Sequence, residues 1–161
     1  MILLIIDMQD DFPAARSKEI VQACRREIWR ARKLNASIIT ITYNDLDRDI
    51  TPCLPRIEHA LTGYNNLVSL SKLQDDGSSE IIESCNGNDL DVSLFRICGV
   101  NVDACVKATV TPLIHTYENS RFEFVYEACG CDFTSSVKSG LNLLCFDKPR
   151  TRIIYRQKAI V

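Results

Sequence analysis

The sequence predicts an α/β protein with three layers, in which a mainly parallel sheet of roughly six strands lies between two layers of helices. Short apolar runs alternate along the chain with longer segments whose apolar residues recur at helical spacing. The first run, residues 2–6, is apolar without interruption, which is typical of a strand buried on both faces of a parallel sheet. We therefore expect a Rossmann-like arrangement with right-handed crossovers, and a single domain over residues 1–161.

Segments that are short, rich in apolar or β-branched residues and bounded by turn residues are predicted to be strands. They are residues 2–6, 38–43, 67–71, 92–98, 122–126 and 152–155. Segments with helical periodicity lie between them, and the clearest example places Ile20, Cys24 and Ile28 on one helix face. The predicted helices are residues 13–34, 56–61, 80–85, 103–117 and 135–146. Residues 44–55 are polar, contain two prolines and are predicted to form a loop.

The charge balance excludes several classes of protein. Nineteen basic and twenty-one acidic residues leave a net charge of −2, which excludes a globally basic nucleic-acid-binding protein. The basic segment 16–33 is interpreted as a solvated helix face, so we expect no nucleic-acid partner. No apolar run approaches the roughly 18 residues of a membrane span, and we expect no membrane partner. The run at residues 2–6 ends at Asp7 and lacks the features of a signal peptide, so a cytoplasmic protein is expected.

Eight cysteines are many for a cytoplasmic chain. No CxxC pair is present, and Cys129-Gly-Cys131 has no matching pair elsewhere, so the spacing does not predict a metal site. We expect most of these residues to be reduced and buried as small apolar side chains, with one of them possessing a different role.

Three reactive side chains follow predicted strands. Asp7 comes directly after the first strand, Lys72 after the third, and Cys105 falls in the first turn of the helix after the fourth. Taken singly, they would be a helix-capping loop residue, a surface lysine and a buried small residue. Because parallel strands end at one edge of the sheet, all three are expected to meet there. A base, a cation and a thiol whose pKa is lowered by the helix start are what nucleophilic catalysis needs.

Two segments resemble the isochorismatase-like cysteine hydrolases: LLIIDMQDDF at residues 3–12, and CGVNVDACV at residues 98–106, similar to Gly-Val-x-Thr-Asp-x-Cys-Val. The resemblance implies an Asp-Lys-Cys triad, to which Asp7 and Cys105 match directly. Lys72 fits the family's usual spacing, 33 residues before Cys105. Another alignment places Ser84 there and breaks the triad; we prefer Lys72 because residues 67–71 make the better strand.

The resemblance also implies further site features. A cis peptide bond is expected between Val100 and Asn101, and the backbone amides of Asn101 and Cys105 are expected to form the oxyanion hole. Phe12 and Tyr43 are candidate substrate-binding residues. Family members commonly form homo-oligomers, dimers or larger, and an exposed Trp29 or Phe12 could lie in such an interface.

The chain departs from the family in two places. Val102 stands where a threonine is usual, which removes a hydroxyl group beside the site. Residues 43–46 lack the metal-binding histidines of the nicotinamidases of this superfamily, and His59 and His115 are the only histidines, both in predicted helices. We therefore expect no metal and no cofactor, and a nicotinamidase is disfavoured.

These observations predict a hydrolase that cleaves the amide or carbamoyl C–N bond of a small molecule through a Cys105 thioester. Two alternatives remain open at this point. One is a vinyl-ether hydrolase of the isochorismatase type, which would require several basic residues around a dianionic substrate. The other is a degenerate member of the family that binds a metabolite or a partner without turnover.

Overall fold

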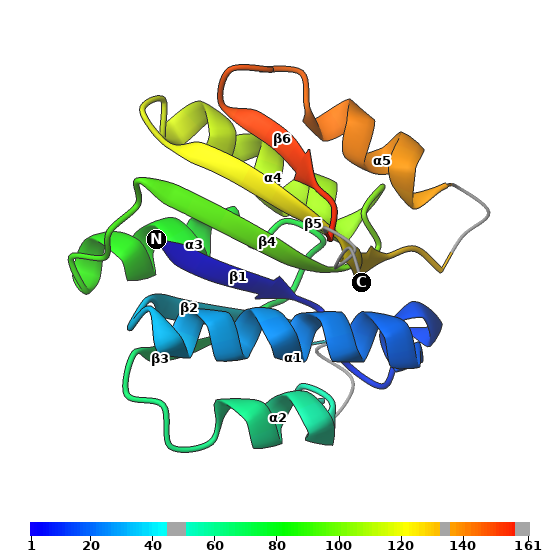
Figure 1. Ribbon diagram of the computed structural model, residues 1–161. Coiled ribbons are helices and arrows are strands. Elements are labelled where there is room, and N and C mark those ends of the chain that lie inside the picture. Colours follow the sequence, from blue (N-terminus) through cyan, green and yellow to red (C-terminus); the bar gives the residue numbers. More distant parts are fainter. Residues whose placement is uncertain (45–50, 133–135, 157–161) are drawn as a thin grey trace, which may run out of the picture.

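Six parallel strands form one sheet at the centre of the molecule (Figure 1), in the order β3-β2-β1-β4-β5-β6. The computed structural model describes residues 1–44, 51–132 and 136–156. The strands are β1 Ile2–Ile6, β2 Ser37–Tyr43, β3 Leu67–Lys72, β4 Leu94–Val100, β5 Arg121–Gly130 and β6 Thr151–Ile154. The predicted fold class is therefore confirmed, and the sheet is parallel throughout.

Helices cover both faces of this sheet (Figure 1). The helices are α1 Lys18–Lys33, α2 Pro55–Leu61, α3 Ser78–Gly87, α4 Cys105–Thr116 and α5 Val137–Leu144. Side chains of β1 alternate between two cores: Leu4 packs with α3, α4 and α5, whereas Leu3 and Ile5 pack with α1 and α2. A strand that supplies both cores must be apolar at every position, which explains the uninterrupted run.

Some boundaries differ from the prediction. The predicted helix over residues 13–34 is divided at Ser17: a 3-10 turn occupies Pro13–Arg16, and the Ser17 hydroxyl then accepts a hydrogen bond from the Ile20 amide as the N-cap of α1. Strand β5 continues to Gly130, because its pairing with β4 shifts register between Ile97 and Gly99 and resumes beyond the shift. Of the predicted loop, residues 45–50 lie outside the described residues.

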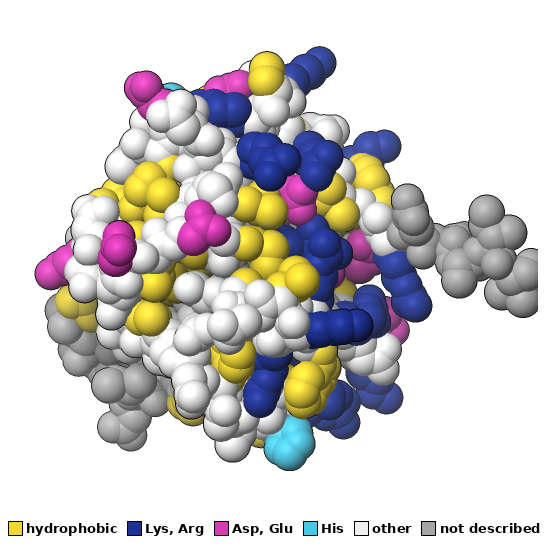
Figure 2. Space-filling view, turned by 60° about the vertical axis from the view of Figure 1, so that its left-hand side comes forward, with side chains coloured by type: hydrophobic (Ala, Val, Ile, Leu, Met, Phe, Trp, Pro, Cys, Tyr) yellow, Lys and Arg dark blue, Asp and Glu magenta, His cyan; other side chains and the backbone are white. Residues whose placement is uncertain are grey.

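A cluster of buried charges lies on the α1 face of the sheet. The Arg96 guanidinium is 2.5 Å from a Glu27 carboxylate oxygen and 2.5 Å from a Glu123 oxygen, and Glu123 also pairs with Arg152. A cavity of about 470 Å³ beside it is lined by basic and acidic residues, among them Arg26. Figure 2 shows Lys and Arg side chains gathered on one part of a molecular face, with acidic side chains alone on another. The surface charge is therefore uneven although the net charge is small.

The chain order of the strands reverses between β1 and β4. Strands β2 and β3 lie on one side of β1, and β5 and β6 lie beyond β4. Sites on doubly wound sheets lie at such a reversal, outside the carboxyl ends of the strands. Within the described residues, no helix has the length and hydropathy that a membrane-spanning segment needs.

Candidate active site

Asp7 lies directly after β1, next to the reversal. Its backbone is left-handed, with φ of 53°, which aspartate tolerates better than most residues. The Asp7 amide donates to the Ile41 carbonyl at 2.9 Å, and the side chain is fully buried. Gln9 fixes the adjoining segment, since its side chain accepts from the Tyr43 amide at 2.7 Å and donates to the Thr51 carbonyl at 2.8 Å.

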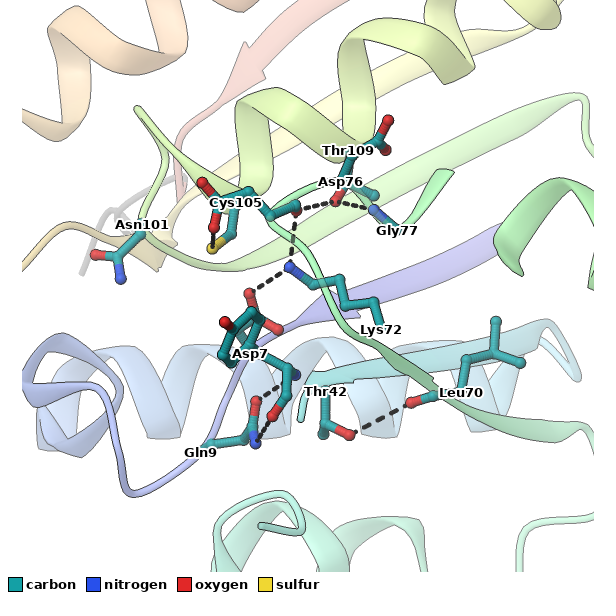
Figure 3. Close-up of polar contacts among 12 residues, drawn as sticks. Asp7, Gln9, Thr42, Leu70, Lys72, Asp76, Gly77, Asn101, Cys105 and Thr109 are labelled. Atoms are coloured by element: carbon teal, nitrogen blue, oxygen red, sulfur yellow. Dashed lines mark hydrogen bonds and ion pairs between the residues drawn. The ribbon is translucent and has the colours of Figure 1, made fainter. Parts of the chain in front are cut away.

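Lys72 is the last residue of β3, and its side chain is fully buried. The Nζ atom lies 2.9 Å from Asp7 Oδ2 and donates a hydrogen bond of 2.8 Å to the Asp75 carbonyl (Figure 3). The Tyr43 ring centroid is 5.7 Å from Nζ, which places one of the two candidate substrate residues beside the site. A Cβ atom on Gly77 would fall 2.7 Å from Lys72 Cδ, so a glycine leaves room for the lysine stem.

Cys105 is the first residue of α4 and is 5% exposed. Its Sγ atom lies 3.5 Å from Asp75 Oδ1 (Figure 3). Burial raises the pKa of the Cys105 thiol to about 12, the negative charge of Asp7 adds to the rise, and Lys72 opposes it. The sequence-based expectation of a lowered thiol pKa is wrong for this state, because burial and the carboxylates outweigh the helix start.

The Asp7 carboxylate carries unused acceptor capacity. Burial raises its pKa above the ordinary 3.8; the charge of Lys72 and contact with the Cys105 thiol lower the pKa by less. Despite the short distance to Lys72, neither Asp7 oxygen accepts a hydrogen bond of good geometry within the described residues. A carboxylate with a raised pKa and a free lone pair beside a thiol is suited to accept the thiol proton.

The turn between β4 and α4 differs from the expectation. The peptide bond between Val100 and Asn101 is trans, so the expected cis bond is wrong. The chain instead reverses through a left-handed Asn101, with φ of 51°, after Gly99 with φ of 148°. The Asn101 side chain is held by Asp132, donating to its carboxylate at 3.1 Å and accepting from its amide at 2.9 Å. Two hydrogen bonds with Asp132, which lies just after β5, thus hold the turn.

Sequence reasoning missed Asp75 and Thr109. Asp76 accepts a hydrogen bond of 2.8 Å from the Ser78 amide at the start of α3. Asp75 instead faces Cys105, while the Thr109 hydroxyl donates to the Asp75 carbonyl and accepts from the Gly77 amide, each at 3.1 Å (Figure 3). The available signal was the position of Asp75, three residues after Lys72 at a strand end.

The other sequence candidates contact residues outside the predicted triad. Phe12 is half-buried against the α1-side core, and Ser84 lies in α3, where its carbonyl accepts from the Asn88 amide. His115 stacks on Phe146 at 5.7 Å. Within the described residues, no group of three or more His, Cys, Asp or Glu side chains could hold a metal ion.

Val102, which replaces the usual threonine, belongs to the core. Val102 is fully buried, and a Cβ atom on Gly140 would fall 2.8 Å from one of its methyl groups. An apolar side chain at position 102 therefore packs under α5. Six of the eight cysteines are buried.

Comparison with solved structures places this fold among known ones. The chain matches MAR1 ribonuclease of Caenorhabditis elegans with a TM-score of 0.77 and 17% identity, covering 96% of this chain and 75% of that one. It matches the pyrazinamidase/nicotinamidase of Streptococcus mutans with a TM-score of 0.75 and 17% identity, covering 96% and 100%. It matches N-carbamoylsarcosine amidase of Thermoplasma acidophilum with a TM-score of 0.71 and 16% identity, covering 99% and 98%.

The chain therefore has the fold of the isochorismatase-like hydrolases, as its two motifs suggested. No family model matches the sequence, and no curated protein matches it either. The names of the similar structures cover a ribonuclease and two amidases, so the fold alone does not select a reaction. The chemistry of the site has to do so.

Proposed function

We propose that this protein is a cysteine hydrolase that cleaves an amide or carbamoyl C–N bond of a small molecule through a thioester on Cys105. One observation carries the proposal: Lys72 Nζ lies 2.9 Å from Asp7 Oδ2 in the interior, and the charges of both groups act on the buried Cys105 thiol. A base, a cation and a nucleophile thus share one point at the carboxyl edge of the sheet, which supports the triad assigned by resemblance.

The first step is proton transfer within the site. Asp7 accepts the thiol proton of Cys105, and the resulting thiolate attacks the carbonyl carbon, forming a C–S bond while the C=O π electrons move to oxygen. The raised pKa of Asp7 favours its protonated form, and the Lys72 charge stabilises the thiolate that replaces the carboxylate charge. The high resting pKa of Cys105 is consistent with a thiol that is deprotonated only when the base acts.

The developing oxyanion requires donors. The Cys105 amide is one candidate, because Cys105 opens α4 and first-turn amides have no acceptor within the helix. The Asn101 amide is a second candidate on the resemblance alone. One such donor is typically worth about 3 kcal/mol. When the tetrahedral adduct collapses, the C–N bond breaks and protonated Asp7 gives its proton to the leaving amine. Asp7 then accepts a proton from water, whose oxygen attacks the thioester, and the proton returns to sulfur as the acid leaves.

The vinyl-ether hydrolase alternative, and the ribonuclease activity named for one similar structure, fit this charge distribution less well. A dianionic vinyl ether or an RNA phosphodiester would bring negative charge to a site where Asp7 and Asp75 flank Cys105 and Lys72 is already paired with Asp7. An RNA oligonucleotide and a vinyl-ether dicarboxylate, incubated with the protein in parallel, are therefore expected to remain intact.

The test is ammonia release from a panel of primary amides and carbamoyl compounds. We expect at least one compound to be hydrolysed, and Cys105→Ala to abolish its turnover while leaving the thermal unfolding temperature within a few degrees of the wild type. Cys145→Ala is the matched control and should remain active, because Cys145 lies at the end of α5. Hydrolysis by Cys105→Ala at the wild-type rate would overturn the mechanism.

If no compound in the panel is hydrolysed, thiol reactivity decides between an enzyme and a non-catalytic binding protein. In an active site of this kind, Cys105 is expected to be alkylated faster in the wild type than in Lys72→Met, since Lys72 stabilises its thiolate. Equal alkylation rates in the two proteins would favour the non-catalytic alternative.

A further inference from the structure

A second carboxylate lies against the candidate nucleophile. Asp75 Oδ1 is 3.5 Å from Cys105 Sγ, on the turn between β3 and α3 (Figure 3). The backbone of this turn is held from two sides: the Asp75 carbonyl accepts from Lys72 Nζ at 2.8 Å and from the Thr109 hydroxyl at 3.1 Å. Lys72 and Thr109 are both buried, so the carboxylate is carried by a turn that is tied to the interior.

Asp75 differs from Asp7 in its exposure. Asp7 is fully buried and paired with Lys72, whereas Asp75 is an exposed residue. Cys105 is almost completely buried, so the exposed carboxylate that contacts its sulfur lies toward solvent. A ligand that reaches the sulfur from the side of Asp75 therefore meets this carboxylate.

The charges around the sulfur do not balance. Asp7 and Asp75 contribute two negative charges, Lys72 contributes one positive charge, and the Lys72 ammonium is paired with Asp7. Within the described residues, the Asp75 carboxylate takes part in no ion pair. A ligand cation near Asp75 would meet an uncompensated negative charge, and a ligand anion would be repelled by it.

We infer that Asp75 is a specificity-determining residue, which selects substrates carrying a cationic or N–H-donating group next to the scissile carbonyl and rejects anionic ones. The selection among substrates rests on the proposed function. The selection among molecules that reach Cys105 rests only on the geometry of the turn. The substrate class it names is the small amide or carbamoyl compound with an amino group close to the bond that is cleaved.

The first experiment measures charge selection without turnover. Two methanethiosulfonate reagents, one with a trimethylammonium group and one with a sulfonate group, each form a mixed disulfide with a thiolate and release methanesulfinate. Modification of Cys105 is followed by mass spectrometry of the peptide 103–107, released by cleavage before Asp103 and after Lys107, which contains no other cysteine. The quantity of interest is the ratio of the cationic to the anionic rate, from which any change in the thiolate fraction cancels.

We expect this ratio to exceed that of a free cysteine peptide, and Asp75→Asn to lower it by about 25-fold, since one unit charge at about 4 Å in water changes the two rates by roughly 5-fold each, in opposite directions. Asp76→Asn is the matched control. Its side-chain oxygen can still accept from the Ser78 amide, so removing this neighbouring charge should leave the ratio within about 2-fold of the wild type. An unchanged ratio in Asp75→Asn, or a Cys105 that reacts with neither reagent, would overturn the inference.

The second experiment uses glycinamide, propionamide and succinamate as cationic, neutral and anionic primary amides. The wild type should prefer glycinamide over propionamide in kcat/KM, and Asp75→Asn should reduce that preference by about 5-fold while Asp76→Asn retains it. Hydrolysis with no effect of Asp75→Asn would overturn the selectivity and leave the proposed function standing. A charge-selective Cys105 in a protein that hydrolyses no amide would overturn the proposed function and leave the selectivity standing.

Discussion

Two clusters of buried charge lie on the same sheet and are built differently. At the carboxyl edge, Asp7 faces one cation, Lys72, and neither of its oxygens accepts a well-formed hydrogen bond within the described residues. On the α1 face, Glu123 is paired with both Arg96 and Arg152, and Arg96 pairs in addition with Glu27. The first cluster leaves a carboxylate short of partners, and the second gives each carboxylate at least one guanidinium.

The difference in partners decides the direction of each pKa. Burial raises the pKa of both carboxyls, but hydrogen bonds and charge from Arg152 and Arg96 hold the pKa of Glu123 below its ordinary 4.5. Lys72 does not offset the burial of Asp7, and the pKa of Asp7 is raised. A buried carboxylate whose oxygens are paired with guanidinium groups stabilises the fold and stays ionised, whereas one whose oxygens lack such partners is available to exchange a proton. The Glu123 cluster is therefore suited to stabilising the fold, and the Asp7 cluster to proton transfer.

The largest effect is expected from Asp7→Asn. This change keeps the shape and the tolerance for a left-handed backbone but removes the base, so kcat/KM for the best amide should fall by about 1000-fold. Initial rates of ammonia release measure it. Glu123→Gln is the contrasting variant, which should lose stability and keep its rate. A rate for Asp7→Asn within 10-fold of the wild type would show that Asp7 is not the base.

The next effect is a loss of stability from Arg96→Met. This change leaves Glu27 and Glu123 buried without their shared cation, which should lower the free energy of unfolding by about 3–5 kcal/mol. Urea unfolding measures it. The control is Arg152→Met, which removes an arginine whose side chain is 62% exposed and should cost no more than about 1 kcal/mol. Equal losses in the two variants would contradict the view of Arg96 as the centre of the cluster.

The fold and the pairing of Asp7 with Lys72 could be predicted because they follow from local patterns. The run at β1 identifies a doubly buried strand, and a parallel sheet brings its strand ends to one edge. Asp7 and Lys72 form an ion pair at this edge, and Cys105 opens the helix that follows β4. The weakest strand, β3, is at the sheet edge, where alternating serines are tolerated.

The features that sequence reasoning missed depend on tertiary distances. Asp75 and Asp76 are chemically identical neighbours, and the hydrogen bonds of Lys72 and of Thr109 with the turn at 75–77 hold the Asp75 carboxylate toward the sulfur. The prediction of a lowered pKa for the Cys105 thiol was wrong for a related reason. The position of Cys105 in its helix can be read from the sequence, but its burial and its two carboxylate neighbours cannot.

The smallest and sharpest effect is the pH dependence of stability, because the two clusters should give slopes of opposite sign. For Glu123, the folded pKa is below 4.5, so the unfolded chain binds more protons between these values and the stabilisation rises with pH, reaching its full value above 4.5. For Asp7, the folded pKa is above 3.8, so the folded protein binds more protons and its contribution falls as pH rises through the folded pKa.

Each slope is at most about 1.4 kcal/mol per pH unit, since one proton is exchanged. The measurement is urea unfolding of the wild type, Asp7→Asn and Glu123→Gln at intervals from acidic to neutral pH. The free energy of unfolding of the wild type minus that of Glu123→Gln should increase with pH up to 4.5. The free energy of unfolding of the wild type minus that of Asp7→Asn should decrease above pH 3.8. The two differences can be read independently because the clusters share no ion pair. Differences that run in the same direction would mean that Lys72 compensates Asp7 as fully as the arginines compensate Glu123, and Asp7 would then be a structural carboxylate like its counterpart.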